Sequence, residues 1–259
     1  MDIEAIQRTA IKAAFRSGKV LKSHFGALSE IRKKGNIDLV TKADIESEDI
    51  IVRTIRERFP EHYILAEERG LEMSSLSSCK WIIDPLDGTT NFAHNLPMHA
   101  VSIAFTMNDE VMVGVILNPQ TGELFSAIKG KGAFLNNSPI HVSKSEYISE
   151  SLLVTGFPYD FKDNINPILK RFETCLKASR GVRRLGSAAL DLCFVACGRF
   201  DCFWEQNLKT WDTAAGFLIV CEAGGTITDF SNGSYNPEKN EILATNGLIH
   251  KEMIELLKL

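Results

Sequence analysis

The sequence lacks a hydrophobic run long enough to cross a membrane. Its most continuous apolar stretch covers residues 214–221, far short of the roughly 20 residues that a membrane-spanning helix needs. The pattern of a signal peptide is also missing, because charged residues interrupt the start of the chain, where an apolar region would have to stand. These absences predict a protein without a membrane partner that stays in the cytoplasm.

An excess of positive charge is missing as well. Lysine and arginine together number 29, against 33 aspartates and glutamates, which leaves a net charge of −4. Binding to a nucleic-acid backbone draws on a basic surface. The charge balance therefore argues against a nucleic-acid partner and favours a small ligand.

The six cysteines form no C-x-x-C pair, and most of them stand among apolar neighbours. A zinc site usually shows such pairs. Disulfides are rare in the cytoplasm, so we expect reduced and mostly buried thiols.

What is present is the composition of an ordinary folded protein. Of the 259 residues, 44% are hydrophobic and 24% are charged, which is close to the average for globular proteins. No repeat or low-complexity tract interrupts the chain. A chain of this length buries about three quarters of its unfolded surface on folding, which suits one large domain or two closely packed halves.

Apolar residues at helical spacing predict two helices at the beginning of the chain. The first runs from Ile3 to about Phe25, and the second begins after Thr41 and closes at Pro60. Asn108-Asp109 has the composition of a hairpin turn. The short runs of β type around this turn are Tyr63–Ala66, Trp81–Ile83, Val101–Met107, Val111–Leu117 and Leu124–Ala127.

The second part of the chain alternates helices with short strands. A polar stretch at residues 143–151 separates it from the strand-rich first part. We expect a layered α/β (α+β) fold with an N-terminal half at residues 1–145 and a C-terminal half at residues 146–259. The expected elements of the second half are helices at Pro167–Lys177, Ser187–Cys197, Asp212–Glu222 and Ile249–Leu257, and strands around Phe203, Ile227 and Ile242.

One acidic motif combines a strand end, two carboxylates and a tight turn. The apolar strand from Trp81 ends in Asp84 and Asp87, and Gly88 and Thr89 then turn the chain into a helix. Carboxylates and a backbone carbonyl are the oxygen ligands that Mg²⁺ prefers, and N–H groups at a helix start favour a phosphate. A capped helix start would explain the turn residues equally well.

Two further acidic motifs occur elsewhere in the chain. Glu67 and Glu68 close a short strand, and Asp212 precedes the small residues 214–216. Taken singly, the glutamates suit a solvated edge and Asp212 suits a helix N-cap. Their order along one chain is what favours a site for several metal ions.

In their order, these motifs resemble those of the inositol monophosphatase family, and the likeness extends over nearly the whole chain. The motifs are Glu67-Glu68, Asp84-Pro-Leu-Asp-Gly-Thr-Thr-Asn-Phe92 and Trp211-Asp-Thr-Ala-Ala-Gly216, with support from 38–44, 130–134 and 183–191. The bacterial inositol-1-monophosphatase branch is the nearest likeness. The resemblance implies an αβαβα sandwich, two or three Mg²⁺ ions, inhibition by lithium, a homodimer, and hydrolysis of a small phosphorylated polyol, foremost myo-inositol 1-phosphate, by metal-activated water.

The resemblance also implies roles for the acidic residues. Glu67, Asp84 and the carbonyl of Leu86 would hold one ion, and Asp84, Asp87 and Asp212 a second. Glu67, Thr89 and Asp44 are implied as the catalytic residues, with Asp44 accepting the proton of the Thr89 hydroxyl. Gly88 and Thr89 are implied to bind the phosphate.

Substrate contacts are implied for Asp87, Ala188 and Glu205, which suit a polyol. Lys33 aligns with a basic residue near the family's metal site, although a solvated charge run at residues 32–34 explains it equally well. Arg183 and Arg184 suit a second anionic group or a subunit contact.

Arg69 departs from the family pattern, in which serine or threonine often follows the two glutamates. A guanidinium there could pair with Glu68 or compete with the cation. His94 and His99 follow the metal motif, but Mg²⁺ prefers oxygen, and we expect both to be structural.

The acidic motifs identify the phosphate and the metal, not the alcohol that leaves. Fructose 1,6-bisphosphate, histidinol phosphate and, less well, a 3'-phosphonucleotide are alternative substrates. A regulatory protein or RNA-associated module with secondary phosphatase activity is an alternative of another class. A basic patch built from Arg183, Arg184, Lys129 and Lys131 would favour it.

Overall fold

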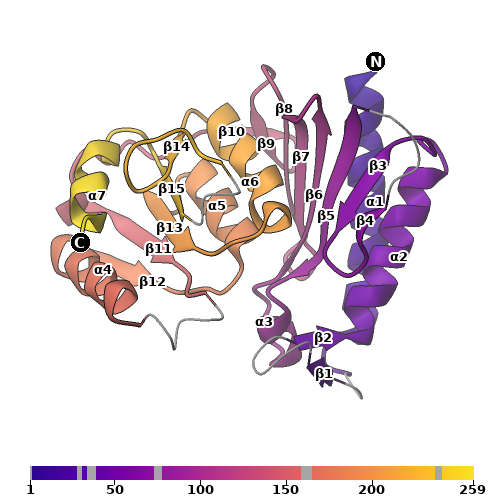
Figure 1. Cartoon of the computed structure of the whole chain (residues 1–259), viewed down its shortest axis with the longest axis horizontal. Helices are drawn as coiled ribbons and strands as arrows, with labels where there is room; N and C mark the ends of the chain where they lie inside the picture. Colours follow the sequence, from indigo (N-terminus) through magenta and orange to yellow (C-terminus); the bar gives the residue numbers. More distant parts are fainter. Residues whose placement is uncertain (1, 28–30, 34–38, 73–77, 159–164, 237–240) are drawn as a thin grey trace.

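A computed structural model describes residues 2–27, 31–33, 39–72, 78–158, 165–236 and 241–259. Helices and sheets alternate in five layers, with two helices at one end, two between the sheets and two at the other end (Figure 1). This confirms the predicted αβαβα sandwich.

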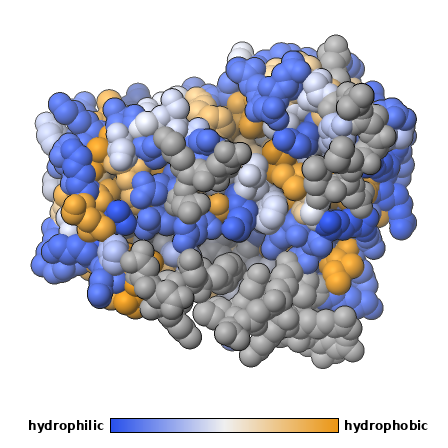
Figure 2. All heavy atoms as spheres, in the orientation of Figure 1, coloured by the Kyte–Doolittle hydropathy of each residue, from blue (hydrophilic) through white to orange (hydrophobic). Residues whose placement is uncertain are grey.

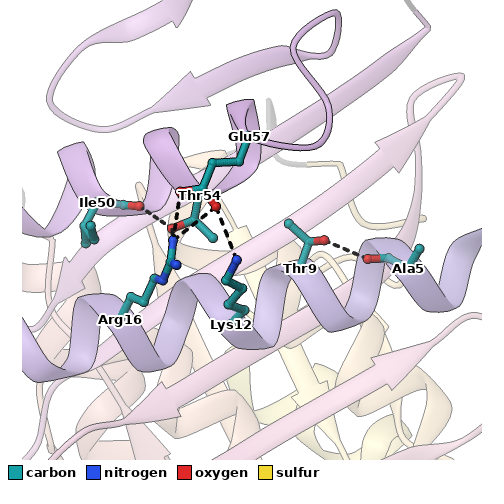
Figure 3. Close-up of polar contacts among 7 residues, drawn as sticks. All are labelled: Ala5, Thr9, Lys12, Arg16, Ile50, Thr54 and Glu57. Atoms are coloured by element: carbon teal, nitrogen blue, oxygen red, sulfur yellow. Dashed lines mark hydrogen bonds and ion pairs between the residues drawn. The ribbon is translucent and has the colours of Figure 1, made fainter.

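The first layer pairs α1 (Ile3–His24) with α2 (Lys42–Arg56), as the periodicity predicted. Small apolar residues of α1, such as Ala10 and Ala13, are fully buried and allow close packing on α2 and the sheet. At the surface, Lys12 and Arg16 of α1 reach Glu57, just after α2, at 3.2 and 3.0 Å (Figure 3). Exposed pairs of this kind contribute only about 0–1 kcal/mol each, so the apolar face holds the layer.

The second layer is an eight-stranded sheet in the order β10-β9-β8-β7-β6-β5-β3-β4. Its neighbours are antiparallel except for β3 and β5, which run parallel. Asn108 and Asp109 form the β6–β7 turn with positive φ at both residues, as the hairpin prediction requires. The strands are β3 (Tyr63–Ala66), β4 (Gly70–Glu72), β5 (Cys79–Asp87), β6 (Ala100–Met107), β7 (Glu110–Asn118), β8 (Glu123–Ile128), β9 (Ala133–Leu135) and β10 (Ser138–Ile140).

The middle helices α5 (Ala188–Ala196) and α6 (Thr210–Glu222) are apolar on nearly all sides, because both sheets pack against them. The second sheet has the order β12-β11-β13-β15-β14, and α4 (Ile165–Ala178) and α7 (His250–Leu257) cover its outer face. Its strands are β11 (Leu152–Thr155), β12 (Gly181–Arg183), β13 (Cys202–Gln206), β14 (Thr226–Thr228) and β15 (Glu241–Thr245).

Three shorter elements complete the described chain. They are the hairpin of β1 (Ile31–Lys33) and β2 (Leu39–Thr41), the single-turn helix α3 (Thr89–Ala93), and a 3₁₀ turn at Ile148–Glu150. Among the described residues no helix is long and apolar enough to cross a membrane. Figure 2 shows one face of the molecule, which is largely hydrophilic with small hydrophobic areas between.

Candidate active site

The acidic motif lies at the end of β5, where the strand leaves its regular pairing. The register with β6 shifts between Asp84 and Asp87. One oxygen of the buried Asp84 carboxyl accepts a bond from the Leu86 N–H at 2.9 Å. This irregularity bends the strand end and turns the two aspartates out of simple alternation.

Gly88 begins the turn into α3 with a φ of +89°. A side chain there would meet two backbone oxygens, those of Met98 at 2.9 Å and Gly186 at 3.1 Å. Glycine is therefore required both by backbone conformation and by space. The N–H groups of Gly88 and Thr89 stand at the start of α3, as the phosphate hypothesis needs, although α3 is too short for its dipole to add much.

The hydroxyl of Thr89 lies 3.2 Å from an Asp44 oxygen and 3.0 Å from the Leu86 carbonyl oxygen. Both Thr89 and Asp44 are buried. Asp44 stands in the first turn of α2, and Ser47, one turn on, donates to the Pro85 carbonyl at 2.8 Å. Two residues of helix α2 therefore hold the end of β5 and the turn that follows it in place.

Glu67 follows β3 directly, and its N–H donates to the Ile83 carbonyl at 3.2 Å, which places it beside the end of β5. The next two residues are anchored on α2 by one buried carboxylate. Glu48 accepts from the Glu68 N–H at 2.9 Å and pairs with Arg69 at 3.0 Å. The turn is therefore held by the protein and is not a freely solvated edge.

Arg69 is paired with two acids of helix α2. Its guanidinium pairs with Glu48 and also with Asp49, both on α2. These partners direct its charge toward the helix. These ion pairs give Arg69 a structural role in the Glu67 turn, and its effect on metal affinity stays a prediction.

Asp212 is the third residue of α6 and not its N-cap. The N-cap position belongs to Lys209, whose backbone N–H donates to Asp212 at 2.6 Å. The N-cap interpretation of Asp212 was wrong because the helix begins two residues earlier. The carboxylate keeps its second oxygen for other partners.

Four carboxylates influence one another at the meeting point of these elements. Burial raises the pKa of Asp84 well above its usual value, and the charges of Glu67, Asp87 and Asp212 raise it further. The pKa of Asp212 is also raised well above its usual range, first by loss of hydration and then by Asp87. Part of Asp212 reaches the cavity surface, yet the surrounding protein still removes most of its hydration.

A cluster of repelling carboxylates with only oxygen donors has the chemistry of a Mg²⁺ site. Among the described residues, no group of three His, Cys, Asp or Glu side chains is drawn together closely enough to enclose an ion. The donor set fits a divalent ion by the chemistry of its oxygens, although no three of these side chains surround one common position in the described part of the structure.

Asp87 connects the end of β5 to the start of α5, about one hundred residues further along the chain. One of its oxygens accepts bonds from the Ser187 hydroxyl at 2.5 Å and from the Ala189 N–H at 2.8 Å, at the start of α5. Burial raises the pKa of Asp87 to about 6, against the opposing effect of bonds from Ser187, Ala189 and Ala188. Sequence reasoning missed Ser187, although its place in the motif 183–191 is a signal that could have found it.

A cavity of about 200 Å³ opens beside these acids. Two larger cavities, of about 720 and 440 Å³, are lined by none of the predicted site residues, so chemistry and not size marks the site. Glu205 and Ala188, the two expected substrate contacts from the second part of the chain, line the cavity, and burial raises the pKa of Glu205 to about 8. Lys209 and Trp211 also line it, and sequence reasoning had not found them.

The three basic residues of the prediction differ in their positions. Arg184 lines the cavity, and its guanidinium lies 5.9 Å from the centre of the Phe157 ring. Arg183 is exposed at the end of β12 and does not line it. Lys33 ends β1, and its side chain lies outside the described part of the structure.

The two histidines after the metal motif also differ. His99 is fully buried and packs edge-on against Phe92, and burial lowers its pKa to about 4. His94 follows the last residue of α3 as its C-cap. Both positions agree with the structural role expected for them.

Replacing Glu48 by glutamine should weaken metal binding without removing a metal ligand. The amide cannot hold both the Glu68 N–H and the Arg69 guanidinium as the carboxylate does. Loss of such a supporting contact typically weakens metal affinity about 10–100-fold. We expect the Mg²⁺ concentration for half-maximal activity to rise at least about tenfold, with maximal activity changed less. Glu46→Gln is the matched control, because it makes the same change on a half-buried side chain of α2 that pairs with His24 and Lys42. Equal effects of the two changes would contradict the role of Glu48.

Comparisons with known proteins agree with this geometry. A sequence model described as the inositol monophosphatase family matches residues 2–258. An inositol-1-monophosphatase from Synechocystis is 44% identical over 99% of this chain and 90% of its own length. A solved inositol monophosphatase structure from Anabaena (Nostoc) superposes with a TM-score of 0.91 at 40% identity, over 99% of this chain and 96% of that one. A Haemophilus influenzae protein named Nus factor SuhB is 40% identical over 96% of this chain and 94% of its own length.

Proposed function

The chain belongs to the inositol monophosphatase family, and we propose that it is a Mg²⁺-dependent phosphatase that hydrolyses myo-inositol 1-phosphate to inositol and phosphate. The observation that carries this proposal is the set of mutually repelling carboxylates around Asp84, three of which line the cavity that also contains Glu205. The acids suit metal and phosphate, and Glu205 suits the hydroxyl groups of a polyol.

Two or three ions are proposed for the acidic cluster. Glu67, Asp84 and the Leu86 carbonyl would hold one, and Asp84, Asp87 and Asp212 another. When bound, Mg²⁺ acidifies a water molecule and offsets the charge on the leaving alkoxide. Lithium sensitivity is part of the same proposal.

The chain's own groups position the reactants. Thr89 orients the attacking water through its hydroxyl, whose proton the buried Asp44 accepts. The N–H groups of Gly88 and Thr89 bind phosphate oxygens. Asp87 is held at the start of α5 by Ser187 and Ala189. These bonds keep the distance between the phosphate end and the polyol end of the cavity constant.

The polyol end of the cavity belongs to the second half of the chain. Ala188, at the start of α5, and Glu205, at the end of β13, line it. A carboxylate accepts hydrogen bonds from neighbouring hydroxyls, which a polyol supplies and a simple alkyl phosphate does not. We propose that residues 1–145 and 146–259 act as one catalytic unit, because Asp87 and Ser187 join them within the site.

Phosphate release from a panel of esters tests the proposal. With Mg²⁺ present, we expect myo-inositol 1-phosphate to be hydrolysed faster than fructose 1,6-bisphosphate, histidinol phosphate or a 3'-phosphonucleotide. Loss of the metal removes several kcal/mol of transition-state stabilisation, so chelation should lower the rate at least about a hundredfold. Li⁺ should inhibit. Equal rates with and without metal would contradict the proposal.

A regulatory, RNA-associated role is the alternative, and relatives named Nus factor SuhB are compatible with it. Two of the four basic residues that would build its patch are already paired with acids: Lys129 with Glu110 and Lys131 with Glu4. The retained set of acidic residues favours catalysis. Cytoplasmic location, homodimer formation and the absence of a nucleic-acid partner remain parts of the proposal.

A further inference from the structure

Glu205 lies beside a glycine at the end of the neighbouring strand. Strands β11 and β13 run parallel, with Val154 opposite Phe203 and Thr155 opposite Trp204. Gly156 and Glu205 follow next in this register, and both line the cavity. Side chains of lateral neighbours in a sheet project to the same face, so a side chain on Gly156 would compete with Glu205 for one space.

The carboxyl group of Glu205 already occupies that space. A Cβ atom built on Gly156 would have three nearest neighbours, and all three are carboxyl atoms of Glu205, far inside van der Waals contact. No positive φ is involved, so the requirement for glycine is steric and not conformational. No other glycine of the described chain has a built Cβ so close to another atom.

A further acid lies near this pair. Asp191 of α5 is buried, and neither of its carboxyl oxygens has a hydrogen-bond partner among the described residues. Burial raises the pKa of Asp191 well above its usual value, and the charge of Glu205 raises it further. The close fit between the Glu205 carboxyl group and the bare backbone of Gly156 is therefore the contact on which the inference rests.

We propose that Gly156 is a specificity-determining position: its lack of a side chain lets the Glu205 carboxylate lie across the end of β11 and face the alcohol part of the substrate. The inference rests on the proposed function only for the identity of that alcohol. A side chain at position 156 displaces Glu205 and lowers the preference for polyol esters, while the carboxylate cluster at the phosphate end keeps its arrangement.

A double-mutant cycle between Gly156→Ala and Glu205→Ala tests this, with myo-inositol 1-phosphate and with phenyl phosphate, whose leaving group carries no further hydroxyl. Gly156→Ala alone should lower kcat/KM for the inositol ester at least about tenfold, the effect expected when a polar substrate contact is lost. Phenyl phosphate turnover should change less than about threefold. In the Glu205→Ala background, where the space is free, Gly156→Ala should have no further effect.

Thermal unfolding gives a second measurement that does not depend on activity. Gly156→Ala should lower Tm, and adding Glu205→Ala should restore most of the loss. Gly181→Ala, on the adjacent strand β12, is the matched control, because the nearest atoms there belong to side chains at 3.3 and 3.8 Å. Additive effects of the two changes on both kcat/KM and Tm would overturn the inference. A wild-type protein that hydrolyses neither ester would instead overturn the proposed function, and the Tm cycle would still decide the inference.

Discussion

Asp84→Asn is expected to abolish phosphatase activity and, at the same time, to stabilise the metal-free protein. Asp84 is the acid proposed to be shared by two ions, and its loss removes several kcal/mol of electrostatic stabilisation. Turnover should fall at least about a thousandfold, which corresponds to about 4 kcal/mol. The asparagine oxygen can still accept the bond from the Leu86 N–H, so the strand end should keep its shape.

The gain in stability follows from the same charges. Glu67, Asp87 and Asp212 each repel the buried Asp84 carboxylate, and an amide removes that repulsion. A gain of about 1 kcal/mol would raise Tm by about 2–4 °C in a chain of this size. Tm should be measured after chelation and again with Mg²⁺, which should stabilise the wild type far more than the variant.

Asp109→Asn is the matched control, since it makes the same chemical change on the exposed β6–β7 turn. It should alter neither turnover nor the Mg²⁺-dependent shift in Tm. The same substitution at Asp87 or Asp212 should also inactivate the enzyme. Full activity in either variant would contradict the hypothesis of two ions.

The second large effect is expected at Thr89. Thr89→Val keeps the shape of the side chain but removes the hydroxyl that lies 3.2 Å from Asp44. If this hydroxyl orients the attacking water, kcat should fall about a hundredfold or more. Turnover at saturating Mg²⁺ is the measurement.

Thr89→Ser distinguishes a requirement for the hydroxyl from a requirement for the shape of the turn. Serine keeps the hydroxyl and should retain activity within about tenfold of the wild type. The Mg²⁺-dependent rise in Tm should persist in both variants, because Thr89 is proposed to orient water and not to hold the metal. Equal losses in the serine and valine variants would show that the hydroxyl alone does not account for the effect, which would contradict its proposed role in orienting the water.

In the proposed mechanism, phosphate chemistry and choice of alcohol rest largely on different residues. The ends of β3 and β5 supply three of the four clustered acids, and the start of α6 supplies the fourth, Asp212. Ala188 of α5 and Glu205 of β13 line the cavity at the proposed polyol end. The Glu48, Asp84 and Thr89 variants test the chemistry, and the Gly156 variant tests the choice of alcohol.

Local patterns in the sequence predicted the longer elements well. The helix α1 and the strands β3 and β6–β8 lie within one residue of their expected positions, because each is long or regular enough to show its period. The helix α2 begins where expected but ends at Arg56, short of Pro60, where it was expected to close. The strands β4, β9, β10, β11 and β12 were not predicted. Each has three or four residues, too few to show an alternation.

The sequence by itself determined the acidic residues, the turn at Gly88 and the resemblance to a phosphatase family, since these depend on residues adjacent in the chain. Only the tertiary structure decided what holds them. The Asp87–Ser187 bond joins residues 100 positions apart, and Arg69 turns to α2. The tertiary structure also decided that Asp212 lies inside a helix and that Gly156 leaves space for the Glu205 side chain. Such contacts arise from the packing of the two sheets around α5 and α6, and no local pattern in the sequence records which distant residues that packing brings together.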